Sequence, residues 1–457
     1  MAIHVLIIGG GTGGLALAHA LKKANTNITF TVYERDRTRT DGLYGYRVGI
    51  SPEGSRALAA CIPTGLFDIF RQTTAITPDY FNMLTEQYEE LLCISGFGQS
   101  SEDAVGAERS VSRMTLRQLL LTGIEDSVEF NKYFTHYRVN PDGTVTAFFK
   151  DGTSAVGNLL VGADGSNSPV RRQYLPHAVL KNSGIYGAAM KVPLTEETRQ
   201  LLMPQVLRGV TMVNAPHGDN CIIHVMEFPW DHQGHLKHNK NIGGNDEELI
   251  KSWPGMKFDN TRDYILLGWS AHSQRLPDDF MSLDGPSIYA LVRERTALWH
   301  PNFQKLIKIA DPTTCFPINI RTSERIPPWT SSNITLIGDA VHTMTPGLGV
   351  GANTALLDAQ ILAGNLISAA EKDLDIVSAV ADYEERMHSY AWKRVEKSLE
   401  RFDADSDIYK PGWRGWFAMT LMRNGLRIVN WMPPLKRRMA AAITAERGER
   451  DERKDKR

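Results

Sequence analysis

The chain has 457 residues, of which 42% are hydrophobic and 23% charged, and its net charge is −1. This composition is typical of a globular protein with substantial hydrophobic cores, and the near-neutral charge gives no general attraction for nucleic acid. Length alone suggests about three domains. The cysteines Cys61, Cys93, Cys221 and Cys315 are far apart, which favours free thiols in a reducing compartment over disulfides or a zinc site. No uncharged apolar run reaches the length of a membrane span, and the first expected strand begins at residue 3, so we expect a cytoplasmic protein without an integral membrane segment.

The first strong pattern runs from Ile3 to Glu34. An apolar run over residues 3–8 predicts a buried strand, and a glycine-rich turn, a helix to Lys23 and a second strand over residues 28–33 follow. The turn carries G-x-G-x-x-G at Gly9, Gly11 and Gly14. This order predicts a dinucleotide site, with a diphosphate at the helix N-terminus and a ribose at Glu34.

Several features before residue 180 add to this site. Arg47 stands between Gly45 and Gly49, where backbone can approach a ligand, and Ser51 is the expected N-cap of a following helix. Ser112 is expected to begin another helix, and Arg113 in its first turn suits either a phosphate partner or solvent. We expect strands of uncertain bounds between residues 75 and 108, a β-hairpin over residues 137–155, and a buried strand that ends at Asp164 and Gly165.

The pattern of apolar and polar residues changes between residues 181 and 320. Strand-like runs at residues 185–192, 221–228 and 264–269 are separated by long polar loops, which predicts a mainly antiparallel inserted domain. Tyr186, Met226 and Trp269 suit an apolar pocket, although core packing explains such residues as well. His224 is either a substrate hydrogen-bond partner or a core histidine. A metal site is not favoured, because the spacing of His232, His235 and His238 drifts round a helix and Gly234 indicates a loop.

A second strand, glycine-rich loop and helix follow at residues 334–366. Asp339 is expected to end the strand, and the loop contains Pro346, Gly347, Gly349 and Gly351 before a helix from Ala352. A second site of close backbone approach suits a ligand longer than NAD, such as FAD. Helices are expected over residues 375–447, followed by a charged, frayed tail. Their aromatic and basic residues around Trp416 suit a membrane surface, but we favour packing of the apolar face on the protein.

Three motifs in this order resemble a known family. GGGTGG with Glu34, GADGSNSPVRR at residues 162–172 and GDAVHTMTPGLGVGAN at residues 338–353 resemble the fingerprints of class A, single-component FAD-dependent monooxygenases of the para-hydroxybenzoate hydroxylase type. The resemblance implies an NAD(P)H-dependent enzyme that transfers one oxygen atom from O2, through a flavin C4a-hydroperoxide, to an aromatic or polyketide-like apolar molecule. One departure is Val350, where many members have Gln.

The resemblance also implies roles for individual residues. Arg113 resembles the arginine on the flavin phosphates, Asp164 and Gly165 the motif linked to FAD and the nicotinamide donor, and Asp339 the group on the flavin side chain. Arg47 resembles the loop arginine near the flavin, and we name Arg47 and His224 as catalytic candidates. The expected cofactor site comprises Gly9, Gly11, Thr12, Gly13, Gly14, Glu34, Arg35, Arg47, Arg113, Asp164, Gly165, Gly338, Asp339, Pro346, Gly349, Val350, Gly351, Ala352 and Asn353.

The expected fold is α/β, with a Rossmann-like FAD-binding domain of the GR2 type, an inserted antiparallel substrate domain and a C-terminal helical segment. We assign residues 1–75, 109–180 and 321–385 to the first domain, 76–108 and 181–320 to the second, and 386–457 to the C-terminal segment. The protein is expected to be a monomer or homodimer. A flavin-dependent reductase and a non-catalytic FAD-binding protein stay open, and a halogenase is less favoured because no G-W-x-W-x-I motif is present.

Overall fold

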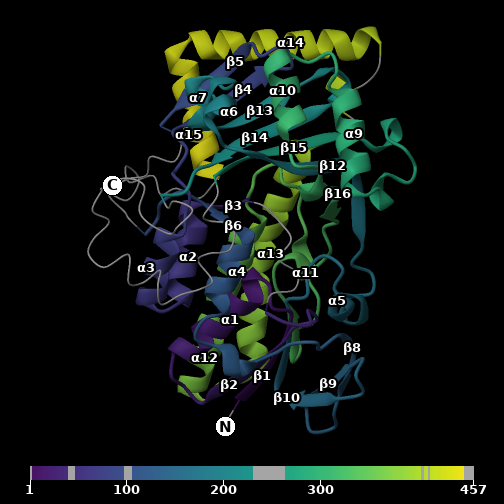
Figure 1. Ribbon diagram of the computed structural model, residues 1–457. Helices are drawn as coiled ribbons and strands as arrows, with labels where there is room; N and C mark the ends of the chain where they lie inside the picture. The colour runs from purple at the N-terminus through teal and green to yellow at the C-terminus, as the bar shows by residue number, and fades with distance from the viewer. Residues whose placement is uncertain are drawn as a thin grey trace.

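The computed structural model describes residues 3–39, 47–96, 105–229, 263–402, 406–409 and 412–446. Figure 1 shows two large sheets at opposite ends of an elongated molecule, with the N-terminus at the lower end and helix α14 along the upper end. Helices α12 and α13 lie in the lower and middle parts of the same view. The described residues form two hydrophobic cores, one around each large sheet.

The lower sheet has five parallel strands. Their spatial order is β17 (Ile334–Leu336), β11 (Leu159–Gly162), β1 (Ile3–Ile8), β2 (Ile28–Tyr33) and β7 (Val128–Glu129). The central strand β1 is buried over its last four residues, as expected for a parallel strand covered on both faces. The surrounding helices are α1 (Thr12–Lys23), α2 (Pro52–Cys61), α3 (Thr64–Gln72), α4 (Arg113–Leu121), α5 (Pro169–Tyr174), α11 (Asp339–His342), α12 (Gly351–Lys372) and α13 (Ile376–Glu400).

The upper sheet has seven strands, and every neighbouring pair is antiparallel except β13 and β4. Their order is β16 (Phe316–Ser323), β12 (Leu180–Pro193), β15 (Tyr264–His272), β14 (Asn220–Met226), β13 (Gly209–Asn214), β4 (Tyr80–Thr85) and β5 (Glu90–Ser95). The predicted fold class, a Rossmann-like sheet with a mainly antiparallel second sheet and C-terminal helices, is therefore confirmed. The division into six segments stays a proposal, which the two separate cores support.

Two small sheets complete the described strands. β8 (Phe134–Val139), β9 (Val145–Phe149) and β10 (Ser154–Gly157) form an antiparallel meander, so the expected hairpin gains a third strand. β3 (Arg47–Ile50) pairs antiparallel with β6 (Arg109–Ser112), and Figure 1 shows this pair between the two large sheets. Arg47 therefore begins a strand instead of lying in a loop. Ser51 caps α2 as predicted, accepting from the Gly54 N–H at 3.2 Å.

The upper half contains helices where the sequence suggested long polar loops. These are α6 (Glu196–Gln200), α7 (Pro204–Leu207), α9 (Gly285–Arg295) and α10 (Pro301–Ile309). Each of α9 and α10 buries only one narrow apolar face. The many polar residues between the apolar ones made the helical spacing difficult to recognise in the sequence. Strand β13 was also missed, and Asp339 opens α11 after the turn at Gly338 instead of ending a strand.

The C-terminal helices α14 (Trp413–Trp431) and α15 (Pro433–Glu446) were predicted, but the orientation of α14 was not. We favoured packing of its apolar face on the protein, and this is wrong, because Trp413, Trp416 and Trp431 are exposed. The covered side of α14 contains the buried residues Gly415 and Met419, and ion pairs join Arg423 to Glu86 and Arg427 to Glu89 between β4 and β5. Within the described residues, no helix combines the length and apolar character needed to cross a membrane.

Candidate functional site

The first glycine-rich turn joins β1 to α1 and leaves one open side. Gly9 has φ +112°, and a Cβ there would lie 2.4 Å from the Ala163 carbonyl oxygen. A Cβ on Gly14 would lie 2.2 Å from the Gly9 carbonyl oxygen, so these two glycines are required by packing. A Cβ on Gly11 would meet nothing closer than 3.9 Å. The open side at Gly11 and the N-terminus of α1 together suit a diphosphate group.

The carboxylate of Glu34 is fixed at the end of β2. Its Oε2 atom accepts the N–H of Gly10 at 2.6 Å, and Oε1 accepts the N–H of Asp36 at 3.0 Å. The guanidinium of Arg117 lies 2.9 Å from the Asp36 carboxylate and 3.8 Å from that of Glu34. Arg117 was not among the predicted residues. Its place four residues after Arg113, on the same face of α4, is the signal that could have found it.

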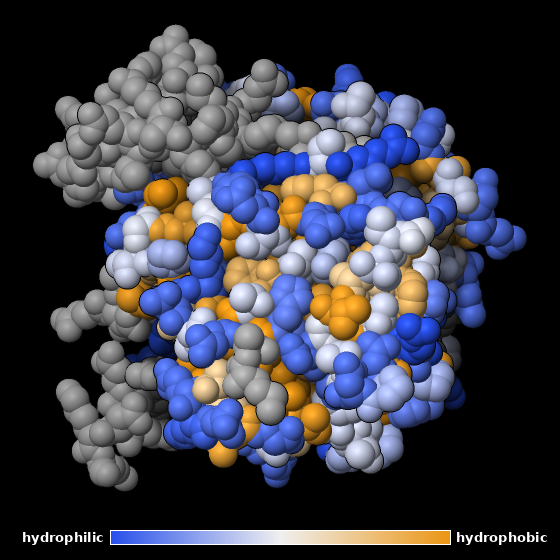
Figure 2. Space-filling view, turned by 90° about the horizontal axis from the view of Figure 1, so that it is seen from below, coloured by the Kyte–Doolittle hydropathy of each residue, from blue (hydrophilic) through white to orange (hydrophobic). Residues whose placement is uncertain are grey.

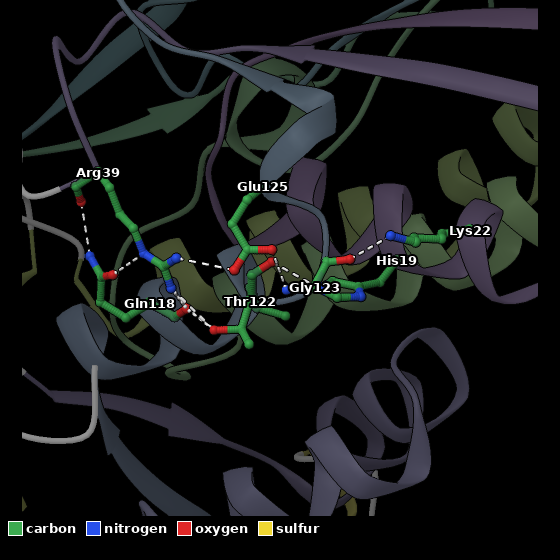
Figure 3. A network of polar contacts seen from close by, with 8 residues as sticks. His19, Lys22, Arg39, Gln118, Thr122, Gly123 and Glu125 are labelled. Atoms are coloured by element: carbon green, nitrogen blue, oxygen red, sulfur yellow. Dashed lines mark hydrogen bonds and ion pairs between the residues drawn. The ribbon is translucent and has the colours of Figure 1, made fainter. Parts of the chain in front are cut away.

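A polar network behind this site fixes the segment after β2 against α4 (Figure 3). The Nε atom of Arg39 donates to the Gln118 side chain at 2.6 Å, and its Nη1 atom lies 3.2 Å from the Glu125 carboxylate. Lys22 of α1 donates to the Gly123 carbonyl at 2.6 Å. These contacts set the position of α4 relative to α1, and therefore of the arginines that α4 carries.

Arg113 and Asp339 carry opposite charges that interact between the first and third motifs. Both residues are exposed to solvent. Desolvation nevertheless lowers the pKa of Arg113, with Arg117 adding to the effect and Asp339 opposing it. Desolvation also raises the pKa of Asp339, opposed by His342 and Arg113. The two side chains therefore combine exposure to water with opposite charges that act on each other.

The second motif meets the third in the same region. Desolvation raises the pKa of Asp164 to about 6. Its Oδ2 atom accepts the N–H of Val170 at 3.3 Å, while Oδ1 is buried without a hydrogen-bond partner among the described residues. Gly165 has φ +77° and open space beside it. Arg171 donates to the Ala340 carbonyl at 2.9 Å, which joins this motif to α11.

The third motif ends at the N-terminus of α12. Val350 is the N-cap, and its carbonyl accepts the first bond of the helix from the N–H of Thr354 at 2.8 Å. The N–H groups of Gly351 and Ala352 precede that bond, so the helix geometry leaves them without intrahelical partners. They can donate to an anionic or carbonyl oxygen. Pro346 lies exposed in the preceding loop.

Asn353 connects the third motif to the strand that carries Arg47. Its Oδ1 atom accepts the N–H of Ser51 at 2.8 Å, and its Nδ2 atom donates to the carbonyls of Gly49 at 2.9 Å and Gly349 at 3.1 Å. The Asn353 side chain therefore holds the loop and β3 together instead of pointing into open space. Arg47 begins β3, and its Nε atom donates to the Ser110 hydroxyl at 3.1 Å.

Other expected cofactor residues take different positions. Thr12 opens α1, and a Cβ on Gly13 would lie 3.3 Å from the Ala355 carbonyl oxygen, so Gly13 allows α1 to approach α12. A Cβ on Gly338, at φ +61°, would lie 2.9 Å from the Ala355 Cβ. Arg35 is exposed beside Glu34. The structure therefore brings the three motifs together, with Arg35 at the rim.

The expected substrate residues lie on opposite faces of the seven-stranded sheet. Met226 packs in the core shared with the parallel sheet, and His224, two residues earlier on β14, has the same facing. Trp269 and Tyr186 belong to the core under α9 and α10, where the Tyr186 ring stacks on Phe280 at 5.9 Å. Only His224 and Met226 therefore face the half of the molecule that contains the three motifs.

His224 is buried, and the positive charge of Arg47 acts on its imidazole. Burial, followed by the charge of Arg47, lowers the pKa of His224 well below its ordinary value. Its Nδ1 atom has no hydrogen-bond partner among the described residues. It lines a small pocket with Ile76, Thr77, Pro78, Leu207, Arg208, Gly209, Val225 and Glu227.

His232, His235 and His238, considered for a metal site, lie outside the described residues. Within the described ranges, no group of three histidine, cysteine or acidic side chains is arranged to hold a metal ion. All four cysteines are free thiols.

Comparison with known proteins shows the family to which the chain belongs. A family model described as FAD binding domain matches residues 293–398. A solved structure of a candidate FAD-containing monooxygenase from Photorhabdus luminescens is 30% identical, with a TM-score of 0.74, and the match covers 88% of this chain and 98% of that one. The chain belongs to the FAD-dependent monooxygenase family.

Other relatives of this chain differ from it in length to different extents. A dual O-methyltransferase/FAD-dependent monooxygenase of Cercospora beticola is 30% identical over 86% of the chain, but the chain spans only 45% of that relative. An FAD-dependent monooxygenase of Talaromyces islandicus is 28% identical, with 93% and 97% of the two chains covered. The Klebsiella pneumoniae HpxO structure with FAD and uric acid has the same fold, with 24% identity, a TM-score of 0.69 and coverage of 95% and 96%.

The residues of this family member fit FAD. The open side at Gly11 admits a diphosphate, the unpartnered Asp164 Oδ1 can accept from a polar ligand group, and the N–H groups at the start of α12 can donate. These three features lie along the interface between the first, second and third motifs. This interface is thus suited to a long ligand that carries both a phosphate-rich end and a polar ring.

Proposed function

We propose that this chain uses NAD(P)H and O2 to insert one oxygen atom into an aromatic or polyketide-like small molecule, with FAD as its cofactor. The observation that carries the proposal is that Arg113 and Asp339 interact electrostatically beside the three motifs, and we propose that they line one cofactor cleft with the N-terminus of α12. When bound there, FAD would supply hydride acceptance and oxygen activation. The protein would supply binding, orientation and electrostatic stabilisation.

We assign the binding of FAD as follows. The ribose would lie against Glu34, the diphosphate at Gly11 with Arg113, and the flavin side chain at Asp339. The N–H groups of Gly351 and Ala352 would donate to the ring, where negative charge increases on reduction. Val350 is the buried N-cap of α12 and stands where many family members have Gln. This difference in side chain leaves the backbone N–H groups of Gly351 and Ala352 in place.

The substrate would lie between this cleft and the sheet face that carries His224 and Met226. An apolar wall with one hydrogen-bonding group suits an aromatic molecule that bears a hydroxyl or carbonyl. Neutral His224 can donate or accept one hydrogen bond without adding charge. We do not retain Tyr186 and Trp269 for substrate contact, because they pack on the opposite face.

The test measures oxygen incorporation. Holoprotein is incubated with NADH or NADPH and a panel of phenols and aromatic polyketides under ¹⁸O₂, and products are analysed by mass spectrometry. We expect NAD(P)H oxidation to accelerate with a substrate and one labelled oxygen atom to enter the product. A Gly11→Val variant, which is expected to lack FAD, gives the background.

Other outcomes identify the alternatives. A reduced, unlabelled product would support a flavin-dependent reductase. Failure of NAD(P)H to reduce correctly bound flavin under every condition would support a non-catalytic FAD-binding protein. Hydrogen peroxide alone would indicate an oxidase, or an uncoupled reaction that a wider substrate panel must resolve.

A further inference from the structure

Helix α14 presents its apolar side to solvent. Six large hydrophobic residues on it have exposed fractions between 55% and 85%. Trp413, Phe417 and Leu421 follow each other at intervals of four residues, so they lie along one face of the helix. The complete set is Trp413, Trp416, Phe417, Leu421, Ile428 and Trp431, and we call it the α14 apolar face.

The covered side of α14 carries the buried residues Gly415 and Met419, and polar side chains beside them contact the segment from Glu86 to Cys93. Arg423 pairs with Glu86, Arg427 lies 2.6 Å from Glu89, and Asn430 donates to Glu90 at 2.9 Å. The side chain of Asn430 also accepts the N–H of Cys93 at 3.1 Å. These contacts fix the rotation of the helix. The α14 apolar face therefore points outward as a consequence of specific pairing.

Positive charge predominates along α14 and α15, although Glu86, Glu89 and Glu90 lie beside α14. Between Trp413 and Ala445 the sequence contains no Asp or Glu and six basic residues. Glu86 and Glu89 neutralise Arg423 and Arg427. The other four are Arg414 on α14, whose guanidinium lies 5.7 Å from the Trp413 ring, and Lys436, Arg437 and Arg438 on α15.

These properties favour an anionic lipid surface over a second copy of the chain. A two-fold contact between two α14 helices would place the same positive charges near each other. Tryptophans at both helix ends suit the boundary between headgroups and acyl chains, and exposed basic residues are attracted to anionic headgroups.

The location of α14 gives it access to a flat surface. Figure 1 shows the helix along the end of the molecule beyond β5, opposite the end where the N-terminus lies. Figure 2, seen from below, shows that opposite end, where hydrophilic residues separate the hydrophobic ones. The α14 apolar face, which the exposed residues Asn424 and Arg427 interrupt, thus lies at one extremity of the described molecule.

We propose that α14 docks this protein peripherally on anionic phospholipid bilayers, with the α14 apolar face inserted at the headgroup boundary. The basic residues Arg414, Lys436, Arg437 and Arg438 give the preference for anionic lipid. The helix is too polar on its anchored side to span the bilayer, so it lies in the plane of the surface. This proposal does not depend on the reaction catalysed.

The test is co-sedimentation of holoprotein with phosphatidylcholine vesicles that contain or lack phosphatidylserine. We expect binding to the anionic vesicles that weakens with salt. Trp416→Ser combined with Leu421→Ser should lower the partition coefficient by roughly tenfold or more, because two apolar side chains no longer insert. The matched control is Leu374→Ser, a leucine of similar exposure (58%) after α12, which should bind like wild type.

A charge pair and a spectroscopic measurement complete the test. Arg437→Glu with Arg438→Glu should remove the preference for anionic lipid, whereas Lys305→Glu with Lys308→Glu, the same charge change on α10, should keep most of it. Brominated lipid should quench tryptophan fluorescence in wild type, and Trp413→Phe, Trp416→Phe and Trp431→Phe together should abolish the quenching while binding persists. FAD content reports folding of each variant.

Three results would overturn the proposal. The first is absence of wild-type binding to anionic vesicles at low salt. The second is equal binding by the α14 variants and wild type. The third is self-association in sedimentation velocity that Trp416→Ser with Leu421→Ser abolishes, without vesicle binding, which would assign the face to a second copy of the chain.

Discussion

The Nε2 atom of His342 and the Oδ2 atom of Asp358 lie 2.7 Å apart in the interior behind the third motif, with both side chains buried. The Asp358 carboxylate also accepts the N–H of Gly338 at 2.7 Å and the hydroxyl of Tyr390 at 2.5 Å. It therefore ties the turn before Asp339 to α12 and α13. Burial alone would lower the pKa of His342, but the carboxylate outweighs this and raises it.

The first prediction follows from this raised pKa. A group that binds its proton more tightly when folded stabilises the protein below its unfolded pKa, and this contribution is lost as the pH rises through the folded pKa. His342→Gln should lower the free energy of unfolding by about 1.5–3 kcal/mol at pH 6, since the Asp358 carboxylate loses a charged donor and keeps its bonds from Gly338 and Tyr390. Denaturation at pH 6 and pH 9 checks this. The loss should be smaller at pH 9, and an equal loss at both values would contradict a protonated histidine.

A pair of glycines separates ligand access from packing. Gly11→Val should abolish FAD retention with little change in apoprotein stability, because the space beside Gly11 is open until a diphosphate occupies it. Gly14→Ala should instead destabilise the apoprotein by about 1–3 kcal/mol, because its Cβ meets the Gly9 carbonyl oxygen. Flavin absorbance and chemical denaturation distinguish the two effects. Bright yellow Gly11→Val protein would contradict the proposed diphosphate position.

Arg113 is the second test of the cleft. Arg113→Ala should weaken FAD binding roughly ten- to a hundredfold, because it removes a charge-assisted hydrogen bond of about 1.5–3 kcal/mol. Arg172→Ala, an exposed arginine on α5, is the matched control and should leave the dissociation constant unchanged. Fluorescence titration of apoprotein with FAD gives both constants. Equal FAD affinities for the two variants would show that Arg113 is an ordinary surface arginine without a phosphate partner.

The sequence predicted the parts of this site that depend on local spacing. Gly9, Gly11, Gly14 and Glu34 belong to one strand–turn–helix–strand unit, whose geometry follows from contacts within about thirty residues. The glycines of the third motif could be placed for the same reason, whereas Asp339 was expected to end a strand and instead opens α11. Their assembly into one cleft required the family resemblance, because no local pattern specifies which distant motifs meet.

Residues that act across long separations could not be predicted. Asn353 contacts Ser51 across 302 positions, and Asp358 resembles any polar residue within a helix until His342 is packed against it. The predicted orientation of α14 was wrong for a related reason. Amphipathic spacing shows that a helix has two faces, but which face is covered depends on distant partners, here Glu86 and Glu89 between β4 and β5.

Asp164 gives a prediction with the opposite pH dependence from an ordinary carboxylate. Because its folded pKa is raised to about 6, the folded state binds the proton more tightly, and stability falls as the pH rises from about 4 through 6. Asp164→Asn removes this cost, so the apoprotein variant should exceed wild type by up to about 3 kcal/mol at pH 7.5. The two proteins should converge at pH 4. A variant that is less stable than wild type at pH 7.5 would show that the carboxylate is favourably paired.

His224 provides the final prediction, on the substrate side of the proposed cleft. Burial and Arg47 keep the pKa of His224 well below its ordinary value, so the imidazole is neutral throughout the range in which such an enzyme is assayed. Neutral imidazole can orient a substrate hydroxyl by a hydrogen bond, but its titration cannot shape the pH–rate profile above pH 6.

His224→Phe should therefore lower kcat/KM by roughly tenfold to a hundredfold, the effect of one lost hydrogen bond in a desolvated site, while FAD affinity stays constant. His224→Asn should recover part of the activity. Ile223→Val, on the opposite face of the same strand, is the control and should change kcat/KM little. Steady-state rates between pH 6 and 9 complete the measurement. If an inflection of the wild-type profile disappears in His224→Asn, the imidazole titrates during turnover and acts as an acid or base instead of a fixed hydrogen-bond partner.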